Sequence, residues 1–273
     1  MPRAIPLTGT ATWWPSTLYQ TTTLELRRAG ERLLIDPGIS PWEIEEIVSA
    51  STMPVTEVLI THGDWDHVMA LGILSDAHVT SSSATAERIR SGTARSEIER
   101  EAAPLLLPYR SIERLHVEQE VDPPADVRLG AWRAVCRAGL GHTDDGLITW
   151  LPDEHLLVVG DYLSSLEIPS CYSSVNDYRA TLQTLISIIE RERPQFVVVG
   201  HGRPHTSEQA LRIADEDLEY LEAVLAYADA GCPPERAEQI AVPVRLAGSG
   251  DLIVHAANIA RACEAATAVA TSG

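Results

Sequence analysis

Histidine and aspartate gather at four places along this 273-residue chain, and each place directly follows a short apolar run. The first is the segment 62–67 (HGDWDH), and the other three hold one such residue each. The candidate ligands are His62, Asp64, Asp66, His67, His142, Asp161 and His201. Imidazole nitrogens and carboxylate oxygens suit Zn²⁺, iron and Mn²⁺. Because ligands gather beyond one end of the strands in an open sheet, the pattern predicts one convergent metal site.

The apolar runs that precede these residues are short, as is typical of strands covered on both faces. We expect strands over residues 22–26, 32–35, 58–60, 131–138, 147–151, 156–159 and 196–199. A strand and helix are expected between 78 and about 103, and the proline-containing stretch 104–128 is interpreted as connecting structure with short strands.

Helix signals alternate with these runs. Ser40 is a candidate N-cap, Pro41 fits the first helical position and Glu43 would complete a capping box. Further helices are expected over residues 68–74, from Asn176 or Asp177 to Pro194, from Ser207 to Gly231, briefly from Pro233 and Pro234, and from Asp251 to about Ala266. The sequence therefore predicts two β-rich halves with interleaved helices, followed by a helical tail.

Composition restricts the class of protein. Hydrophobic residues make up 45% and charged residues 22%, which excludes disordered and collagen-like chains. The formal net charge of −18 disfavours a nucleic-acid partner. No apolar run approaches the roughly 20 residues of a membrane-spanning helix, and the N-terminal residues show no apolar signal region. We expect a cytoplasmic protein without a membrane partner, acting on a small molecule, and the sequence leaves the oligomeric state open.

The four cysteines lie far apart and form no CxxC pair, so neither a zinc ribbon nor a disulfide framework is indicated. They are Cys136, Cys171, Cys232 and Cys263. We expect four reduced thiols, mostly buried as small apolar side chains.

The four places, taken in order, resemble the metallo-β-lactamase-fold hydrolase superfamily, in the branch that includes glyoxalase II. That family shows a strand ending in HxHxDH, a GHT loop, an aspartate that ends a hairpin and a final GH strand end. The corresponding segments here are 61–67 (THGDWDH), 141–143 (GHT), 160–161 (GD) and 200–201 (GH), within a match over about residues 20–206. The early segment 34–38 (LIDPG) also resembles the family's first aspartate turn.

The resemblance implies an α/β fold, the four-layered αβ/βα sandwich of two mixed sheets with helices outside. Residues 1–206 would form this domain, and residues 207–273 would add C-terminal helices packed on it. It also implies two divalent metal ions. The ligand sets would be His62, Asp64 and His142 for one metal and Asp66, His67 and His201 for the other, with Asp161 as the bridge.

The chain departs from the family at Asp64, where the family's second histidine stands. A carboxylate here resembles the glutamate of the diiron flavodiiron proteins, but the chain has no flavodoxin-like domain to support their redox role. Because aspartate is shorter than glutamate, the sequence leaves open whether two metals bind or the first site stays empty. Zn²⁺ is the expected metal, with iron or Mn²⁺ as alternatives.

The resemblance implies hydrolysis of a small carbonyl substrate: an ester, a thioester or a lactone. Two metals about 3.5–4 Å apart share a water and lower its pKa toward 7, so that a bridging hydroxide can attack the carbonyl carbon. Asp66 would also orient this nucleophile, and Tyr162 would donate a hydrogen bond to the oxyanion. β-Lactam hydrolysis fits less well, because several lactamases of this fold have Cys or His where this chain has Asp161.

Two other classes of function stay open. One is a non-haem iron oxygenase of the same fold, similar to the persulfide dioxygenases, since Asp64 makes a site for a harder metal credible. The other is a degenerate binding member in which Asp64 marks decay; six of the seven family ligand types are retained, which argues against it. Metal analysis with a measurement of oxygen consumption would separate an oxygenase from a hydrolase.

Residues around the motifs give weaker expectations. Trp13, Trp14 and Trp65 are candidates for the apolar wall of a substrate cleft, although core packing is the default for tryptophan. The resemblance implies that Asp36 supports the ligands by hydrogen bonding.

Overall fold

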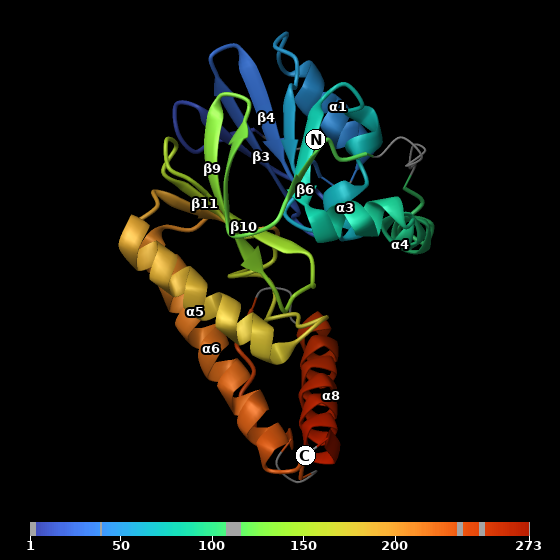
Figure 1. Cartoon of the computed structure of the whole chain (residues 1–273), viewed down its shortest axis with the longest axis vertical. Coiled ribbons are helices and arrows are strands. Elements are labelled where there is room, and N and C mark those ends of the chain that lie inside the picture. Colours follow the sequence, from blue (N-terminus) through green and yellow to red (C-terminus); the bar gives the residue numbers. More distant parts are fainter. Residues whose placement is uncertain (1–3, 39, 108–115, 234–236, 246–248, 273) are drawn as a thin grey trace.

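Two β-sheets meet face to face in the computed structural model, which describes residues 4–38, 40–107, 116–233, 237–245 and 249–272 (Figure 1). Within these residues the strands of the first sheet are, in spatial order, β1 (Ile5–Pro6), β2 (Ala11–Pro15), β3 (Thr22–Arg28), β4 (Glu31–Ile35), β5 (Glu57–Leu59), β6 (His78–Ser82) and β7 (Gln119–Val121). The strands from β1 to β4 pair antiparallel, and those from β4 to β7 pair parallel.

The second sheet repeats this mixed pattern in the second half of the chain. Its strands are, in spatial order, β12 (Phe196–Val198), β11 (Leu156–Val158), β10 (Gly146–Leu151), β9 (Trp132–Gly139) and β8 (Ala125–Leu129). The β8–β11 pairs are antiparallel, and β11 pairs parallel with β12. Three strands of the parallel pairs, β5 in the first sheet and β11 and β12 in the second, lead into segments that carry candidate ligands.

Helices cover the outer face of each sheet. The helices of the first half are α1 (Pro41–Ser49), α2 (Trp65–Val68), the 3₁₀ turn η1 (Leu71–Ile73), α3 (Ser83–Arg90) and α4 (Thr93–Ala102). The second half adds α5 (Val175–Glu192), α6 (Ser207–Asp229) and α8 (Ser249–Ser272). Figure 1 shows α5 and α6 side by side below the strands, with α8 and the C-terminus at the lower end of the molecule.

Alternation along the strands explains the layers, because successive strand residues point to opposite faces. In β10, Leu147 and Leu151 join the core between the two sheets. Ile148 and Trp150, from the same strand, pack instead with the α5 and α6 helices. All six β10 residues are buried, as the unbroken apolar run predicted. The predicted four-layered αβ/βα sandwich with C-terminal helices is confirmed.

Several expected boundaries shift. α5 begins at Val175 with Ser174 as N-cap rather than at Asn176 or Asp177, because the Ser174 hydroxyl accepts from the Asp177 amide. α8 begins at Ser249, so Asp251 lies in its first turn and does not cap it. The expected helix over 68–74 is divided into α2 and η1. The short helix expected from Pro233 and Pro234 falls largely outside the described residues.

Of the capping box predicted for α1, the structure shows the Ser40 hydrogen bond but not the one predicted for Glu43. The Ser40 hydroxyl accepts from the Glu43 amide, as a cap should. The Glu43 carboxylate, however, accepts from the Ser16 hydroxyl and from the amide and hydroxyl of Thr17. It therefore links α1 to the β2–β3 connection.

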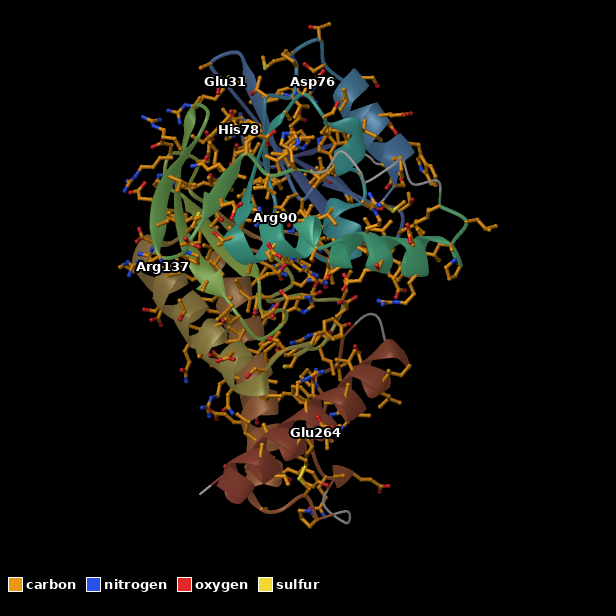
Figure 2. The ribbon with its side chains drawn as sticks, turned by 45° about the vertical axis from the view of Figure 1, so that its right-hand side comes forward. Glu31, Asp76, His78, Arg90, Arg137 and Glu264 are labelled. Atoms are coloured by element: carbon orange, nitrogen blue, oxygen red, sulfur yellow. A yellow bond between two sulfur atoms is a disulfide. The ribbon has the colours of Figure 1, made fainter. Side chains whose placement is uncertain are left out.

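The expectation of four free thiols is wrong for two of them. Cys232 and Cys263 form a disulfide that joins the segment after α6 to α8, with their Cα atoms 6.2 Å apart. The sulfur–sulfur bond lies near Glu264 in Figure 2, at the end of the molecule away from the sheets. Cys136 and Cys171 are free and buried, as expected. Sequence spacing missed the pair because its closeness depends on how α8 packs against α6.

Among the described helices, none combines the length and the apolar character that crossing a membrane requires.

Candidate metal centre

The candidate ligands converge where several strands of both sheets end. β5 leads into His62, and the single turn of helix α2 carries Asp66 and His67. The β9–β10 connection supplies His142, and the turns after β11 and β12 supply Asp161 and His201. Residues separated by up to 139 positions therefore meet at one place, because the two sheets pack with these ends together.

The first group of ligands is His62, Asp64, His142 and Asp161, whose ligand atoms all lie within 4.8 Å of one another. Asp64 Oδ2 is 3.6 Å from His62 Nε2 and 3.4 Å from His142 Nε2. Asp161 Oδ2 lies at nearly the same distances from those nitrogens, 3.6 and 3.3 Å. The aspartate in place of the family's histidine therefore reaches the cluster despite its short side chain.

The second group is Asp66, His67 and His201. Asp66 Oδ2 lies 3.3 Å from His201 Nε2 and 3.8 Å from His67 Nε2. Asp161 faces this group too, with Oδ1 3.2 Å from His67 Nε2 and Oδ2 3.2 Å from His201 Nε2. Asp161 is thus in reach of both groups, as a bridging ligand would be.

The donor atoms fit a metal pair. Among the described residues, the Nε2 atoms of His62, His67 and His142 and the Oδ1 atom of Asp161 are buried without a hydrogen-bond partner. An unpaired buried polar atom is costly, and native proteins rarely leave several together. Divalent first-row metals take imidazole nitrogen and carboxylate oxygen as ligands, so two such ions would satisfy all of these atoms.

Outer hydrogen bonds orient the ligands of the first group. The Thr61 hydroxyl donates to Asp36 Oδ2 at 2.7 Å and lies 3.0 Å from His62 Nδ1. Because the Thr61 hydroxyl donates its proton to Asp36, its oxygen can accept a hydrogen bond from His62 Nδ1–H. This protonation of Nδ1 leaves the lone pair of His62 Nε2 free for a metal. His142 Nδ1 lies 2.8 Å from the Ser170 carbonyl, which fixes the same tautomer.

The second group is supported in the same way. Asp36 Oδ2 also lies 3.1 Å from His67 Nδ1, so one carboxylate serves both groups. His201 Nδ1 lies 3.0 Å from the Tyr19 carbonyl. The Thr21 hydroxyl donates to Asp66 Oδ2 at 3.2 Å. The expected supporting position of Asp36 agrees with this geometry.

Close packing at the strand ends leaves room for no side chain at one glycine. A Cβ atom on Gly200 would overlap the Asp161 carboxylate. The GH pair at residues 200–201 therefore uses its glycine to let Asp161 enter the site and its histidine as a candidate ligand.

Without bound metal, the centre is a network of ion pairs. Burial lowers the pKa of an imidazole, but the Asp161 and Asp64 carboxylates outweigh it and raise the pKa of His142 to about 10. Burial alone would raise the pKa of Asp64, yet His62 and His142 hold it well below its usual range. The pKa of His201 is raised well above normal, because Asp161 and Asp66 outweigh its burial.

A cavity of about 680 Å³ opens onto this centre. Its aromatic lining consists of Tyr19, Trp65 and Tyr172. The charged residues around its wall, besides the candidate ligands, are Arg88, Glu97, Arg100, Glu101, Asp144 and Glu167. Arg88 already pairs with Asp64 and Glu97, and Arg100 with Glu101. The wall is therefore aromatic and polar, with both arginines engaged.

Of the three candidate tryptophans, one lines the cavity and two lie in the core. Trp65 lines the cavity, as one of the two interpretations held. Trp13 and Trp14 do not: they are buried, and their indole N–H groups donate to Thr22 and Glu25. They serve as core because β2 lies inside the first sheet.

Tyr162 is also turned away from the cavity. It is 3% exposed, and its hydroxyl accepts from the His142 amide at 3.1 Å. Because this hydroxyl holds the ligand loop from the core side, the geometry does not favour the expected role as an oxyanion donor. Because Tyr162 follows Asp161 in the sequence, it had to lie near the metal centre, but the sequence did not show which way its side chain points.

The structure adds two residues that sequence reasoning missed. Tyr172 lies at the cavity, with its ring centroid 5.1 Å from that of His142. Arg88 donates to Asp64 Oδ1 at 2.7 Å. Nothing marks Tyr172 in the sequence, but an extra carboxylate in a family motif is a signal that a compensating cation lies nearby.

Comparisons with known proteins agree with this geometry. Residues 16–219 match the family described as the metallo-beta-lactamase superfamily. A metallo-beta-lactamase from Pontibacter korlensis superposes with a TM-score of 0.60 at 16% identity, covering 79% of this chain and 99% of the other. The BLEG-1 B3 metallo-beta-lactamase gives a TM-score of 0.59 at 18% identity, covering 78% and 97%. TMB-1 gives 0.59 at 15% identity, covering 79% and 97%.

A search of curated proteins found no match to the sequence. The structural neighbours, at these identities, establish the fold, and the family match spans most of the chain. Neither the structural neighbours nor the family match shows that the chain belongs to the narrower glyoxalase II branch. With the predicted fold and the convergent His and Asp groups in place, the chain belongs to the metallo-beta-lactamase superfamily, as a metallohydrolase of that fold.

Proposed function

We propose that the protein hydrolyses a small, uncharged carbonyl compound (an ester, thioester or lactone) with a pair of divalent metal ions held by the seven candidate ligands. The observation that carries the proposal is the ring of histidine nitrogens around Asp161. Its carboxylate lies within 3.6 Å of Nε2 of all four candidate histidines, and three of those nitrogens have no hydrogen-bond partner among the described residues.

The positions of these residues indicate a separate role for each of them in hydrolysis. Bound metals would supply a hydroxide at neutral pH and a Lewis acid for the carbonyl oxygen. Asp161 holds the two ligand groups together, and Asp66 reaches from the second group to the cavity wall. Asp66 is held by Thr21 and faces His201, so its carboxylate is fixed where it can accept a proton from the nucleophile.

Tyr172 takes the place that Tyr162 was expected to fill. Its side chain is 57% exposed and lines the cavity beside His142. A phenol at this position can donate a hydrogen bond to the oxygen that becomes negative during attack on a carbonyl. We therefore assign oxyanion stabilisation to Tyr172, which is tested by Tyr172→Phe.

The charge of the wall supports an uncharged substrate. Both arginines at the cavity are paired with carboxylates, whereas Asp144 and Glu167 add negative charge to the wall. Arg88 is enclosed by carboxylates and Arg100 is an exposed residue paired with Glu101, so the described lining offers an anionic substrate no enclosed, unpaired arginine. The aromatic rings of Tyr19, Trp65 and Tyr172 suit the apolar part of an acyl group.

The test is a panel of an aryl ester, an acyl thioester, an acyl-homoserine lactone and a bis-aryl phosphodiester with metal-loaded protein. We expect turnover of at least one carbonyl substrate, little or none of the phosphodiester, and a fall of at least about tenfold in Tyr172→Phe. Trp65→Ala should raise KM, whereas Trp42→Ala, an exposed tryptophan of α1, is the matched control. Preference for the phosphodiester would overturn the proposed substrate class.

A second candidate function is favoured by one observation. Each ligand group offers two histidines and a carboxylate besides Asp161, and a two-histidine, one-carboxylate set is typical of non-haem iron oxygenases. An oxygenase would carry iron and consume O₂ with a persulfide. Metal content of protein grown without added metal, together with an oxygen electrode, separates the two functions.

The metal identity, the branch of the family, the partner and the cellular location are also proposals. We propose zinc as the native metal and a place close to the glyoxalase II-like members, from the order of the THGDWDH, GHT, GD and GH segments. The net charge of −18 continues to favour a small-molecule partner over nucleic acid. A cytoplasmic location is retained as a proposal, although the disulfide removes the argument that rested on four reduced thiols.

A further inference from the structure

Apart from the candidate ligands, Arg88 is the charged residue of the cavity lining with the most carboxylate partners. It lies near the end of α3, and its guanidinium donates to Asp64 Oδ1 at 2.7 Å and to Glu97 of α4. Its other terminal nitrogen lies 3.5 Å from Asp145 Oδ2. Its side chain is 17% exposed, so this carboxylate cage is largely closed to solvent.

Asp64 divides its two oxygens between Arg88 and the histidines. Oδ1 accepts from Arg88, while Oδ2 faces His62 Nε2 and His142 Nε2. A carboxylate whose one oxygen is held by a guanidinium presents the other in a fixed direction. We propose that Arg88 is the positioning residue that makes Asp64 a one-oxygen ligand of the first metal, a role that rests on the metal-dependent function proposed above.

The surroundings of Arg88 show why it is held in place. Glu97 approaches from α4, and Asp145 comes from the GHT loop that also carries His142. Asp145 Oδ2 in turn accepts from the Gly63 amide at 2.9 Å and from the Thr85 hydroxyl at 3.0 Å. The guanidinium therefore links two of the three ligand loops of the first metal, those of Asp64 and His142, with α3 and α4.

The charge balance gives Arg88 a second effect on the same group. Replacing a neutral imidazole with aspartate adds one negative charge to a site that already holds Asp66 and Asp161. A buried charge without a partner is strongly unfavourable, and the guanidinium offsets it. Asp64 and the partly buried Arg88 thus form one unit, in which each residue accounts for the other.

If Arg88 only stabilised the fold, its replacement would not weaken the first metal site selectively. The test therefore measures metal binding at each site separately. Arg88→Met removes the charge and the hydrogen bonds. Arg88→Lys keeps the charge but loses the planar guanidinium, which reaches Asp64 and Glu97 through Nη2 and Asp145 through Nη1. Arg90→Met is the matched control, because Arg90 lies two residues further along α3 and pairs with Glu87 and Glu120 at the surface (Figure 2).

Metal content is measured by elemental analysis, and the affinity of each site by Co²⁺ titration against a chelator. We expect about two metals in the wild-type protein and in Arg90→Met, and about one in Asp64→Ala. Both Arg88 variants should bind the first metal about 10–100-fold more weakly and leave the second unchanged. Wild-type affinity in Arg88→Lys and Arg88→Met would overturn the proposal.

A double-mutant cycle gives a readout that simple destabilisation would not produce. In an Asp64→His background there is no carboxylate to position, so adding Arg88→Met should leave metal affinity unchanged or raise it. An equal loss in both backgrounds would show that Arg88 acts on the fold and not through Asp64. Should Arg88→Met fail to fold alone, the cycle is carried out with Arg88→Lys.

The cycle also separates this proposal from the proposed function. If wild-type protein binds no metal, the metallohydrolase proposal fails. If it binds two metals and cleaves a carbonyl substrate while the Arg88 variants behave as wild type, the positioning role alone fails.

Discussion

Asp161 is the residue through which the two halves of the centre meet. It faces His62 and His142 of the first group and His67 and His201 of the second, and it lies in a turn after a fully buried strand. A buried carboxylate at the end of an apolar hairpin does not contribute to hydrophobic packing. Its burial is explained by the metal ions that it would share.

Asp161→Ala should abolish nearly all hydrolysis while the chain still folds. Loss of one element that stabilises the transition state costs roughly 10²–10³ in rate, and loss of a metal costs more. The measurement is kcat/KM on a substrate that the wild type cleaves, at matched metal loading. Asp153→Ala is the control, since Asp153 lies in the exposed β10–β11 turn and pairs with Arg28. A fall of less than about tenfold would contradict the role of Asp161.

The metal-free protein should lose stability as pH rises. The pKa of His142 is about 10 in the folded chain against an ordinary value near 6.5. A raised folded pKa contributes stability that is complete below the unfolded pKa and is lost as pH rises through the folded one. Guanidinium unfolding of chelator-treated protein at pH 6.5 and pH 9.5 should therefore differ by at least about 1 kcal/mol.

Metal-loaded protein should not share this dependence, because a bound metal requires neutral imidazoles throughout. Loading at pH 7.5 should then release protons, which calorimetry in buffers of different ionisation enthalpy detects. Equal unfolding free energies of the metal-free protein at the two pH values would contradict the ion-pair network.

At the scale of elements, α8 reaches the metal centre through one loop. Asn258 of α8 is 1% exposed. Its side chain accepts from the Cys171 amide at 3.1 Å and donates to the Pro169 carbonyl at 2.6 Å. Between these residues lies Ser170, whose carbonyl orients His142. A helix that carries none of the candidate ligands therefore fixes the loop behind one of them.

Asn258→Ala should lower stability by about 1–3 kcal/mol, because it leaves buried backbone groups unpaired. It should also weaken binding of the first metal, since the Ser170 carbonyl is no longer held. Denaturant unfolding and Co²⁺ titration give the two values, and Asn176→Ala, an exposed residue of α5, is the control. Unchanged metal affinity in a destabilised Asn258→Ala would show that the loop is held by other contacts.

At the scale of the whole molecule, the C-terminal helices belong to the same packed body as the second sheet. Val197 of β12, Leu182 of α5 and Leu221 of α6 share one core cluster. The Cys232–Cys263 bond closes the end of this helical layer that lies away from the two sheets (Figure 2). The disulfide should therefore matter for stability more than for chemistry.

Cys232→Ser should lower the free energy of unfolding by about 2–4 kcal/mol without changing metal content. Alkylation in denaturant without reductant, followed by mass spectrometry, should label two cysteines, Cys136 and Cys171, and reduction should raise this to four. Four labelled cysteines before reduction would show that the bond does not form in the protein as prepared.

Local patterns in the sequence were enough to predict the fold and the set of candidate ligands. Ligand types, their order and the apolar runs before them are local properties: a short buried strand followed by a glycine turn places a polar residue at a sheet end whatever the rest of the chain does. For this reason His62, His142 and Asp161 could be placed at a common site from spacing and resemblance.

Tertiary structure alone decided which way side chains turn and which distant segments meet. Tyr162 follows a candidate ligand yet points into the core, whereas Tyr172 reaches the cavity. Arg88 meets Asp64 because α3 packs across the ligand loop, and Cys232 meets Cys263 because α8 packs along α6. These outcomes depend on the packing of whole elements against one another, which no residue spacing encodes.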